Sequence, residues 1–399
     1  MDPTVLAFLV AAVVIVLGFL GEEIFNRTSI PDPILLLLFG VILGPVFHVF
    51  AKEELISITP YFAALALIII LFDGGLSMNV KEAIKDSPRA LVLAVSGWGL
   101  TVLTTACLCK ILLGFRLLNG LLLGSIVGGS SSIIVIALAK KIKVTGEIET
   151  ILSFESILTD VLCTVGAFAL IDIILSGEIS LQSALSSVAI AFGVGILLGS
   201  VLGITWLIIL ERIKGKPNAY MLTLAMLFLT FVAARSLGGT GALSALFLGL
   251  MIGNAPSVAK VLKFKTTVSI DESVRAFHGQ ISFLIRSFFF VFTGLLFSFT
   301  SLNLFFFGVF LAFIFLGVRG IAVKISTLKS HLNREQTLMT IMLPRGLAAA
   351  VLASLPLTVG VPGSQAFPEI VFLVILTTII ICTVGIAILK RKRREEHPS

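Results

Sequence analysis

The sequence predicts an all-α polytopic membrane protein with thirteen transmembrane helices, its N-terminus outside the cell and its C-terminus in the cytoplasm. Hydrophobic residues make up 57% of the 399 positions and charged residues only 13%, a balance that soluble domains do not have. The apolar residues form long stretches between short polar loops. The net charge of +7 would suggest nucleic acid in a soluble protein, but basic loop residues orient a membrane protein. We therefore expect a multi-pass protein of the plasma or inner membrane, with lipid and not nucleic acid as its partner.

The thirteen spans follow from the length of the apolar stretches. A spanning helix needs about 20 mostly apolar residues. The stretches that approach this length are 4–21, 32–50, 59–76, 88–113, 117–139, 146–175, 181–210, 218–236, 239–255, 277–299, 303–325, 336–356 and 367–389.

The basic residues predict the orientation of these spans. The loops after every odd-numbered span, together with the C-terminal tail and the adjoining span-end residues Arg89 and Lys324, contain 22 of the 29 lysines and arginines. The opposite side has four, and three arginines lie inside predicted spans: Arg286, Arg319 and Arg345. Because cytoplasmic loops are enriched in lysine and arginine, the tail is expected in the cytoplasm.

A weak internal repeat relates the two halves of the chain. Residues 38–44 (LFGVILG) resemble 247–253 (FLGLMIG), and residues 71–76 (LFDGGL) resemble 291–296 (VFTGLL). The matching spans are seven apart, and an odd shift makes the two copies inverted in the membrane. Inverted repeats with a central binding site are typical of secondary transporters. We expect a first repeat at 1–176, a linker helix and loop at 177–216, a second repeat at 217–389 and a basic tail at 390–399.

Two spans at corresponding places in these repeats contain helix-breaking sequences. The fifth span contains Gly-Gly-Ser-Ser-Ser at 128–132, and the twelfth contains Pro-Arg-Gly at 344–346. Glycine and proline weaken a helix, so both spans are predicted to be discontinuous and to cross at their breaks. The hydroxyls of Ser130 and Ser131 and the freed carbonyls are oxygen ligands that suit a cation. Close helix packing through small residues is the alternative explanation.

The sixth span carries two carboxylates, Glu155 and Asp160. Each charge at the centre of a spanning helix costs roughly 2.5–3.5 kcal/mol, and such residues usually line an ion or proton path. Residues four apart share a helix face, so Ser156 can point with Asp160 toward one site while Thr159 lies beside Glu155. A buried carboxylate needs a cation to stay ionised.

The buried arginines are the available partners for these carboxylates. Arg319 is predicted at the membrane depth of Glu155 and is the preferred partner in a structural ion pair, and Arg345 is the second candidate. Asp160 is then left to bind either a monovalent cation or a proton, with Ser156 as a further ligand. If only the neutralised site can change its access, exchange is electroneutral with one cation for one proton.

These residues resemble motifs of the monovalent cation/proton antiporter superfamily, the sodium/proton exchangers, in its NhaP-like branch. The resemblance covers nearly the whole chain and is carried by residues 30–40 (IPDPILLLLFG), Gly44-Pro45, Glu155-Ser156 with Asp160, and Pro344-Arg345-Gly346. It implies that Asp160 binds the cation and the proton, with Ser156 as a ligand, and that Glu155 and Arg319 stabilise the site. It also implies a homodimer with a moving six-helix core, and a transporter for pH homeostasis with no prosthetic cofactor.

Two departures from the family pattern leave the transported ion open. Thr159 stands where the family has asparagine, although its hydroxyl could still bond Glu155. Ser130, Ser131 and Ser132 stand where the family has Thr-Asp-Pro, a version that resembles potassium/proton relatives. We expect Na⁺ or Li⁺ because the sequence has no nucleotide-binding domain of the kind found in potassium efflux relatives. The alternatives are K⁺/H⁺ exchange on the same fold and an ion-coupled symporter for an organic solute.

Overall fold

Helices are the only regular structure in the part of the chain that the computed structural model describes. That part is the whole sequence except residues 1–2, 29, 51, 79, 143, 178–180, 214–215, 217–218, 263–271, 329 and 397–399. The chain divides into two compact units, one of residues 1–63, 86–175 and 286–399 and one of residues 64–85 and 176–285. Each unit draws on both halves of the sequence, so the compact units differ from the predicted repeats, whose boundaries stay a prediction.

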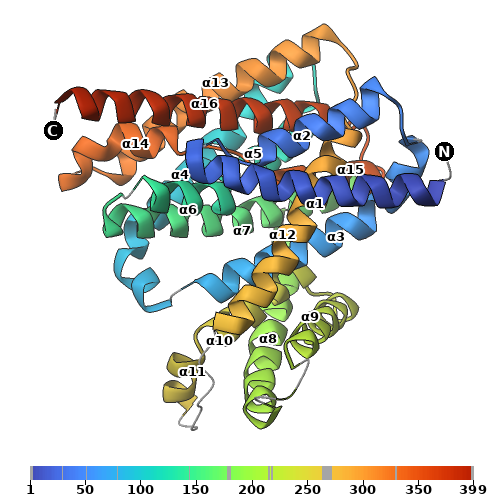
Figure 1. Cartoon of the computed structure of the whole chain (residues 1–399). Helices are drawn as coiled ribbons and strands as arrows, with labels where there is room; N and C mark the ends of the chain where they lie inside the picture. The colour runs from blue at the N-terminus through green and yellow to red at the C-terminus, as the bar shows by residue number, and fades with distance from the viewer. Residues whose placement is uncertain are drawn as a thin grey trace. The chain divides into compact units, whose positions relative to one another are not determined.

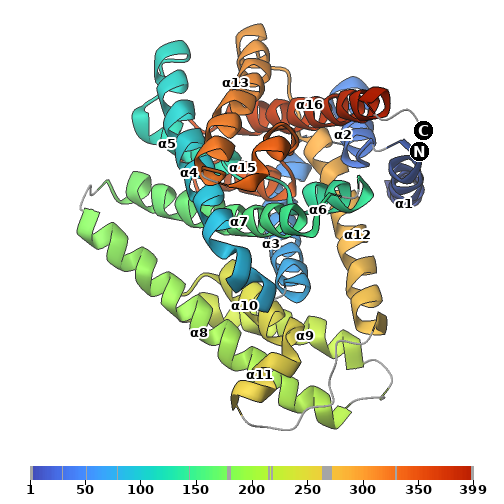
Figure 2. The same ribbon diagram turned by 90° about the vertical axis from the view of Figure 1, so that its left-hand side faces the viewer.

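The first unit contains most of the helices (Figure 1). They are α1 (Pro3–Thr28), α2 (Pro33–Val41) with a π-helical turn at Ile42–Val46, most of α4 (Val80–Leu112), α5 (Leu117–Val127), α6 (Ser132–Lys141), α7 (Gly146–Ser176), α13 (Leu302–Ser326), a 3₁₀ turn at His331–Glu335, α14 (Gln336–Ile341), α15 (Leu347–Thr358) and α16 (Phe367–Glu396). Figure 2 shows α6 following α5 after a break, and α7 beside α6.

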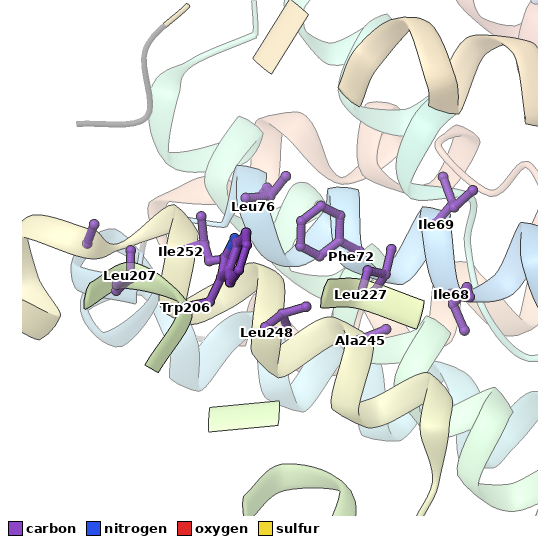
Figure 3. Close-up of a cluster of buried hydrophobic side chains, with 11 residues drawn as sticks. Ile68, Ile69, Phe72, Leu76, Trp206, Leu207, Leu227, Ala245, Leu248 and Ile252 are labelled. Carbon is purple, nitrogen blue, oxygen red and sulfur yellow. The ribbon is translucent and has the colours of Figure 1, made fainter. Parts of the chain in front are cut away.

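The second unit contains α8 (Leu181–Ile213), α9 (Ala219–Ser236), α10 (Gly241–Gly253) and α11 (Ala255–Leu262). The helices α3 (Lys52–Ser77) and α12 (Glu272–Leu295) each contribute to both units. The core of the second unit forms where Phe72 of α3 meets Trp206 of α8 and Leu248 of α10 (Figure 3). The indole nitrogen of Trp206 donates to the Thr223 hydroxyl at 3.1 Å, so this polar atom is satisfied inside an apolar core.

Every predicted span coincides with at least one helix, but the number of spans stays a prediction. Among the described residues, eight helices are long and apolar enough to cross a membrane, or nine if the bent pair α10 and α11 is one span. Shorter apolar helices occupy the other predicted stretches, at residues 33–46, 117–127, 221–236 and 347–358. Two of these are short because the helix is interrupted, at the two places where the sequence predicts a break.

Glycines let pairs of helices approach until their backbones touch. In the first unit, a Cβ on Gly40 of α2 would overlap the Val291 carbonyl oxygen of α12, and one on Gly294 would overlap the Leu37 carbonyl oxygen. In the second unit, a Cβ on Gly75 of α3 would overlap the Leu246 carbonyl oxygen of α10. Small residues allow this approach in membranes, where dispersion and not the hydrophobic effect holds helices together.

Replacing Gly75 by alanine is therefore expected to destabilise the protein. The added methyl group has to displace backbone, and overpacking of this kind costs roughly 1–3 kcal/mol. Gly74→Ala is the matched control, because a Cβ there has no neighbour within 4 Å, and alanine favours a helix by up to about 1 kcal/mol over glycine. Thermal unfolding in detergent measures both variants. Equal melting temperatures would contradict the close contact of α3 with α10.

Candidate functional site

The break between α5 and α6 exposes backbone groups inside the first unit. The helix α5 ends at Val127, and α6 begins at Ser132. Glycine is needed within the break, since a Cβ on Gly129 would lie 2.9 Å from the Cys163 sulfur of α7. The backbone N–H of Ser131 donates to the carbonyl oxygen of Pro344 at 2.7 Å. Pro344 lies in the second break, so an N–H freed by one break is paired with a carbonyl of the other.

The second break lies between α14 and α15 and contains Pro344, whose carbonyl accepts the N–H of Ser131. The backbone N–H of Arg345 donates to the Thr378 hydroxyl of α16 at 3.0 Å. A Cβ on Gly346 would overlap the side chain of Ser131. The two interrupted helices therefore meet at their breaks, in the manner expected of crossing discontinuous helices.

The side chain of Arg345 caps the end of α5. Its Nη1 donates to the carbonyl oxygens of Gly129 at 2.7 Å and Gly128 at 3.3 Å. Its guanidinium carbon lies 5.0 Å from the centre of the Phe315 ring, within the range of a cation–π contact. A positive charge is favourable at the C-terminal end of a helix, where carbonyl groups lack partners. Arg345 was the second candidate to pair with Glu155, and the structure instead places it on these carbonyls.

Glu155 forms a buried, two-pronged ion pair with Arg319 of α13. Two guanidinium nitrogens, Nη1 and Nη2, each lie 3.1 Å from a carboxylate oxygen. The side chains are 3% and 6% exposed, so solvent does not screen the pair. The Nε of Arg319 donates to the Met339 carbonyl at 2.9 Å, and the Ser130 hydroxyl donates to Glu155 at 2.9 Å. Such geometry and additional hydrogen bonds are what a buried ion pair requires.

Asp160 lies one and a half turns further along α7 and has a different environment. Its only hydrogen-bond partner among the described residues is the Ser132 hydroxyl, which donates to Oδ2 at 3.1 Å, apart from the bond that its own backbone carbonyl accepts from Thr164. The residue is 7% exposed, and no cationic side chain of the described chain lies within ion-pair distance of it. The carboxylate is thus buried with one neutral donor.

The hydroxyls of Thr159 and Ser156 both contact Ser130 in the break. The Thr159 hydroxyl, which could have bonded Glu155, donates to the Ser156 carbonyl at 3.0 Å and accepts from the backbone N–H of Ser130 at 3.2 Å. The hydroxyls of Ser156 and Ser130 lie 2.9 Å apart. Ser130 therefore connects the Glu155 carboxylate to Ser156.

Ser132 was missing from the predicted ligands. The run of three serines signalled hydroxyl groups at the break, but neighbouring residues outside a helix point in directions that only the local backbone determines. The groups that could hold a small cation are the Asp160 carboxylate and the hydroxyls of Ser130, Ser132 and Ser156. Ser132 of α6 bonds Asp160 of α7, and Ser130 in the break after α5 bonds Ser156 of α7.

Comparison with known proteins places the chain in a family. Residues 9–391 match the family described as "Sodium/hydrogen exchanger, transmembrane". The K(+)/H(+) antiporter NhaP2 of Shewanella sp. (strain ANA-3) is 29% identical over 98% of this chain and 67% of its own length. The Na(+)/H(+) antiporter 1 of Methanocaldococcus jannaschii is 27% identical over 87% of this chain and 82% of its own.

Solved structures share the fold. The sodium proton antiporter MjNhaP1 from Methanocaldococcus jannaschii at pH 8 superimposes with a TM-score of 0.78 over 97% of this chain and 96% of its own, at 21% identity. A second structure of MjNhaP1, from electron microscopy, gives a TM-score of 0.79 over 100% of this chain and 99% of that one, at 23% identity. The chain is a multi-pass membrane protein, and it belongs to the sodium/hydrogen exchanger family.

Proposed function

We propose that the protein exchanges one Na⁺ or Li⁺ ion for one proton, and that both bind in turn to Asp160. The observation that carries the proposal is the contrast between two carboxylates on one helix. Glu155 is neutralised by Arg319, whereas Asp160 receives a single serine hydroxyl. One carboxylate is a fixed part of the structure, and the other is left for the transported ions.

The charge on Asp160 makes its two ligands compete. An ionised carboxylate in a low-dielectric site is unfavourable until it is neutralised. A bound proton and a bound monovalent cation each remove one negative charge, so the two loaded states have equal net charge. The hydroxyl oxygens of Ser130, Ser132 and Ser156 can replace part of the cation's hydration shell, because hard oxygen ligands suit Na⁺ and Li⁺.

The contacts between helices support alternating access by an inverted repeat. A repeat that equates α2 with α10 and α3 with α12 would map the glycine contact between α2 and α12 onto the glycine contact between α10 and α3. Both contacts involve the segments whose sequences match. The two broken helices, whose breaks meet at Ser131 and Pro344, supply the central site that such repeats usually build. A homodimer, as the family resemblance implies, completes this proposal.

Exchange of K⁺ for protons is the alternative, and two observations favour it. The curated relatives from Shewanella are named K(+)/H(+) antiporters. The break at 128–132 provides three serine hydroxyls where a carboxylate would give a stronger field, and a weaker field favours the larger and more easily dehydrated ion. The distance from the bound cation to the Ser132 hydroxyl and the Asp160 carboxylate decides between the ions, because K⁺ is larger than Na⁺ and Li⁺.

Asp160→Asn is expected to abolish exchange with every cation. The amide has nearly the shape of the carboxylate but neither binds a proton nor neutralises a cation. The measurement is the dequenching of a pH-sensitive dye in proteoliposomes after addition of Na⁺, Li⁺ or K⁺. Asp172→Asn is the matched control, because Asp172 lies on the same helix and is exposed. Exchange retained by Asp160→Asn would remove Asp160 from the role of ion carrier. A wild-type response to K⁺ alone would establish K⁺/H⁺ exchange.

A membrane potential is expected to leave the exchange rate nearly unchanged. One charge moved per cycle would couple to the potential by about 2.3 kcal/mol per 100 mV, and one-for-one exchange moves none. The rate is measured in proteoliposomes with the potential set by a K⁺ gradient and valinomycin, with Na⁺ as the exchanged ion. A rate that changes severalfold with the sign of the potential would overturn the stoichiometry.

Breaking the pair of Glu155 with Arg319 is expected to lower stability. Removal of one partner leaves a buried charge and costs roughly 3–5 kcal/mol, so Glu155→Gln and Arg319→Ala should each lower the melting temperature in detergent. The double variant should lose less than the sum of the two. Arg27→Ala is the control, because it breaks the exposed pair with Glu23, which is worth at most about 1 kcal/mol. Additive losses would argue against the pairing.

A further inference from the structure

A groove lies where the end of α1 meets the end of α16, away from the ion site. It encloses about 440 Å³, within the size range of small-ligand pockets. Its lining includes the basic residues Lys390 and Arg391, the threonines Thr28 and Thr383, and the apolar residues Ile30 and Val384. The groove thus combines positive charge, hydroxyl groups and an apolar surface.

A third basic residue, Lys141, stands beside this groove. It is the last residue of α6, and its Nζ lies 4.6 Å from the centre of the Phe25 ring of α1. The nitrogen is shielded from solvent and has no hydrogen-bond acceptor in the described structure. Lys390 is close enough to repel it. The Phe25 ring is a favourable partner for this ammonium group, and an anion between Lys141 and Lys390 would stabilise both positive charges further.

Two candidate membrane spans end at the groove, and a span ends where the lipid headgroups begin. The apolar spans of α1 and α16 end at Thr28 and Arg391, and both ends line the groove or adjoin it. From there an apolar stripe runs back along α16 at four-residue intervals, through Ile388, Val384 and Ile380, which are 61%, 52% and 45% exposed. A soluble anion would use only the basic residues, whereas a phospholipid would use these residues and the stripe.

We propose that this groove binds an anionic phospholipid. The headgroup phosphate lies between Lys141, Lys390 and Arg391, and an acyl chain lies along the stripe on α16. The sequence continues with three more basic residues, Lys392-Arg393-Arg394, and then with Glu395-Glu396, so residues 390–396 keep a net positive charge. Clusters of basic residues next to a spanning helix attract anionic lipid with about 1 kcal/mol per residue.

The lipid would act on the ion site through one short helix. The helix α6 has ten residues, with Ser132 at one end, bonded to Asp160, and Lys141 at the other. A headgroup that holds Lys141 therefore holds the half-helix that supplies the hydrogen bond to Asp160. This second part of the inference rests on the proposed function, whereas lipid binding itself does not.

Lipid binding is tested on the full chain purified in a neutral detergent. Phosphatidylglycerol and phosphatidylcholine are titrated separately, and binding is measured by native mass spectrometry. We expect phosphatidylglycerol to bind more tightly, and the double variant Lys390→Gln with Arg391→Gln to weaken it by roughly tenfold or more. Lys141→Gln should weaken it by a smaller factor. The double variant Lys110→Gln with Arg116→Gln removes two exposed basic residues elsewhere and should bind as the wild type does.

Three results would overturn the lipid site. Phosphatidylglycerol could bind equally to all variants, or bind no better than phosphatidylcholine. Inorganic phosphate at millimolar concentration could displace the lipid and stabilise the protein to the same extent, which would assign the groove to a soluble anion. The double variant could instead change only the oligomeric state, which would assign the groove to a second copy of the chain. Unchanged melting temperatures verify that the variants fold.

The coupling to transport is tested in proteoliposomes with and without phosphatidylglycerol. We expect the lipid to change the exchange rate of the wild type and of the Lys110/Arg116 control at least twofold, and to have no effect on Lys141→Gln. Equal lipid responses of the wild type and Lys141→Gln would overturn the coupling through α6. Absence of exchange in the wild type under every condition would instead overturn the proposed function, and the binding result would stand.

Discussion

The two-pronged ion pair between Glu155 and Arg319 is the interaction on which the site depends. It joins α7 to α13 with both charged groups out of contact with solvent, and the Met339 carbonyl and the Ser130 hydroxyl complete the hydrogen bonding. Two acidic side chains lie close together on α7, and the low dielectric would raise the free energy of both. Arg319 neutralises Glu155, and Asp160 keeps a single neutral side-chain donor, Ser132.

The uncharged backbone groups at the two helix breaks also need partners inside the protein. A break inside a membrane frees N–H and carbonyl groups that lipid cannot satisfy. Here the N–H of Ser131 reaches Pro344 across the crossing point, and Arg345 binds the carbonyls at the end of α5. The positive charge of Arg345 therefore has a backbone role, and it leaves Asp160 without a cationic neighbour among the described side chains. Irregular backbone is tolerated here because groups at each break form hydrogen bonds with groups at the other.

The sequence predicted the helix breaks because glycine and proline act on the backbone locally, whatever the tertiary structure. The partner of Glu155 followed from comparing depths along two spans, since a buried carboxylate requires a cation and few are available. The contacts of individual hydroxyls could not be predicted. The neighbouring hydroxyls of Ser130 and Ser132 bond Glu155 and Asp160 respectively, and Ser131 between them contacts Pro344 through its backbone N–H, because the dihedral angles of the break set each direction. The Thr159 hydroxyl accepts the backbone N–H of Ser130, which the break leaves without a helical partner. The acceptors of Arg345 likewise exist only after the break has formed.

The glycine contacts restrict how this chain can change over evolution. The loss of one member of an ion pair can be offset by the loss of the other, since no lone charge then remains. No such rescue exists where a side chain at Gly75 or Gly40 would overlap a carbonyl oxygen of the neighbouring helix. Every amino acid has this backbone oxygen, so substituting the partner residue does not remove it. Suppressor mutations must therefore arise away from the contact, by moving a whole helix.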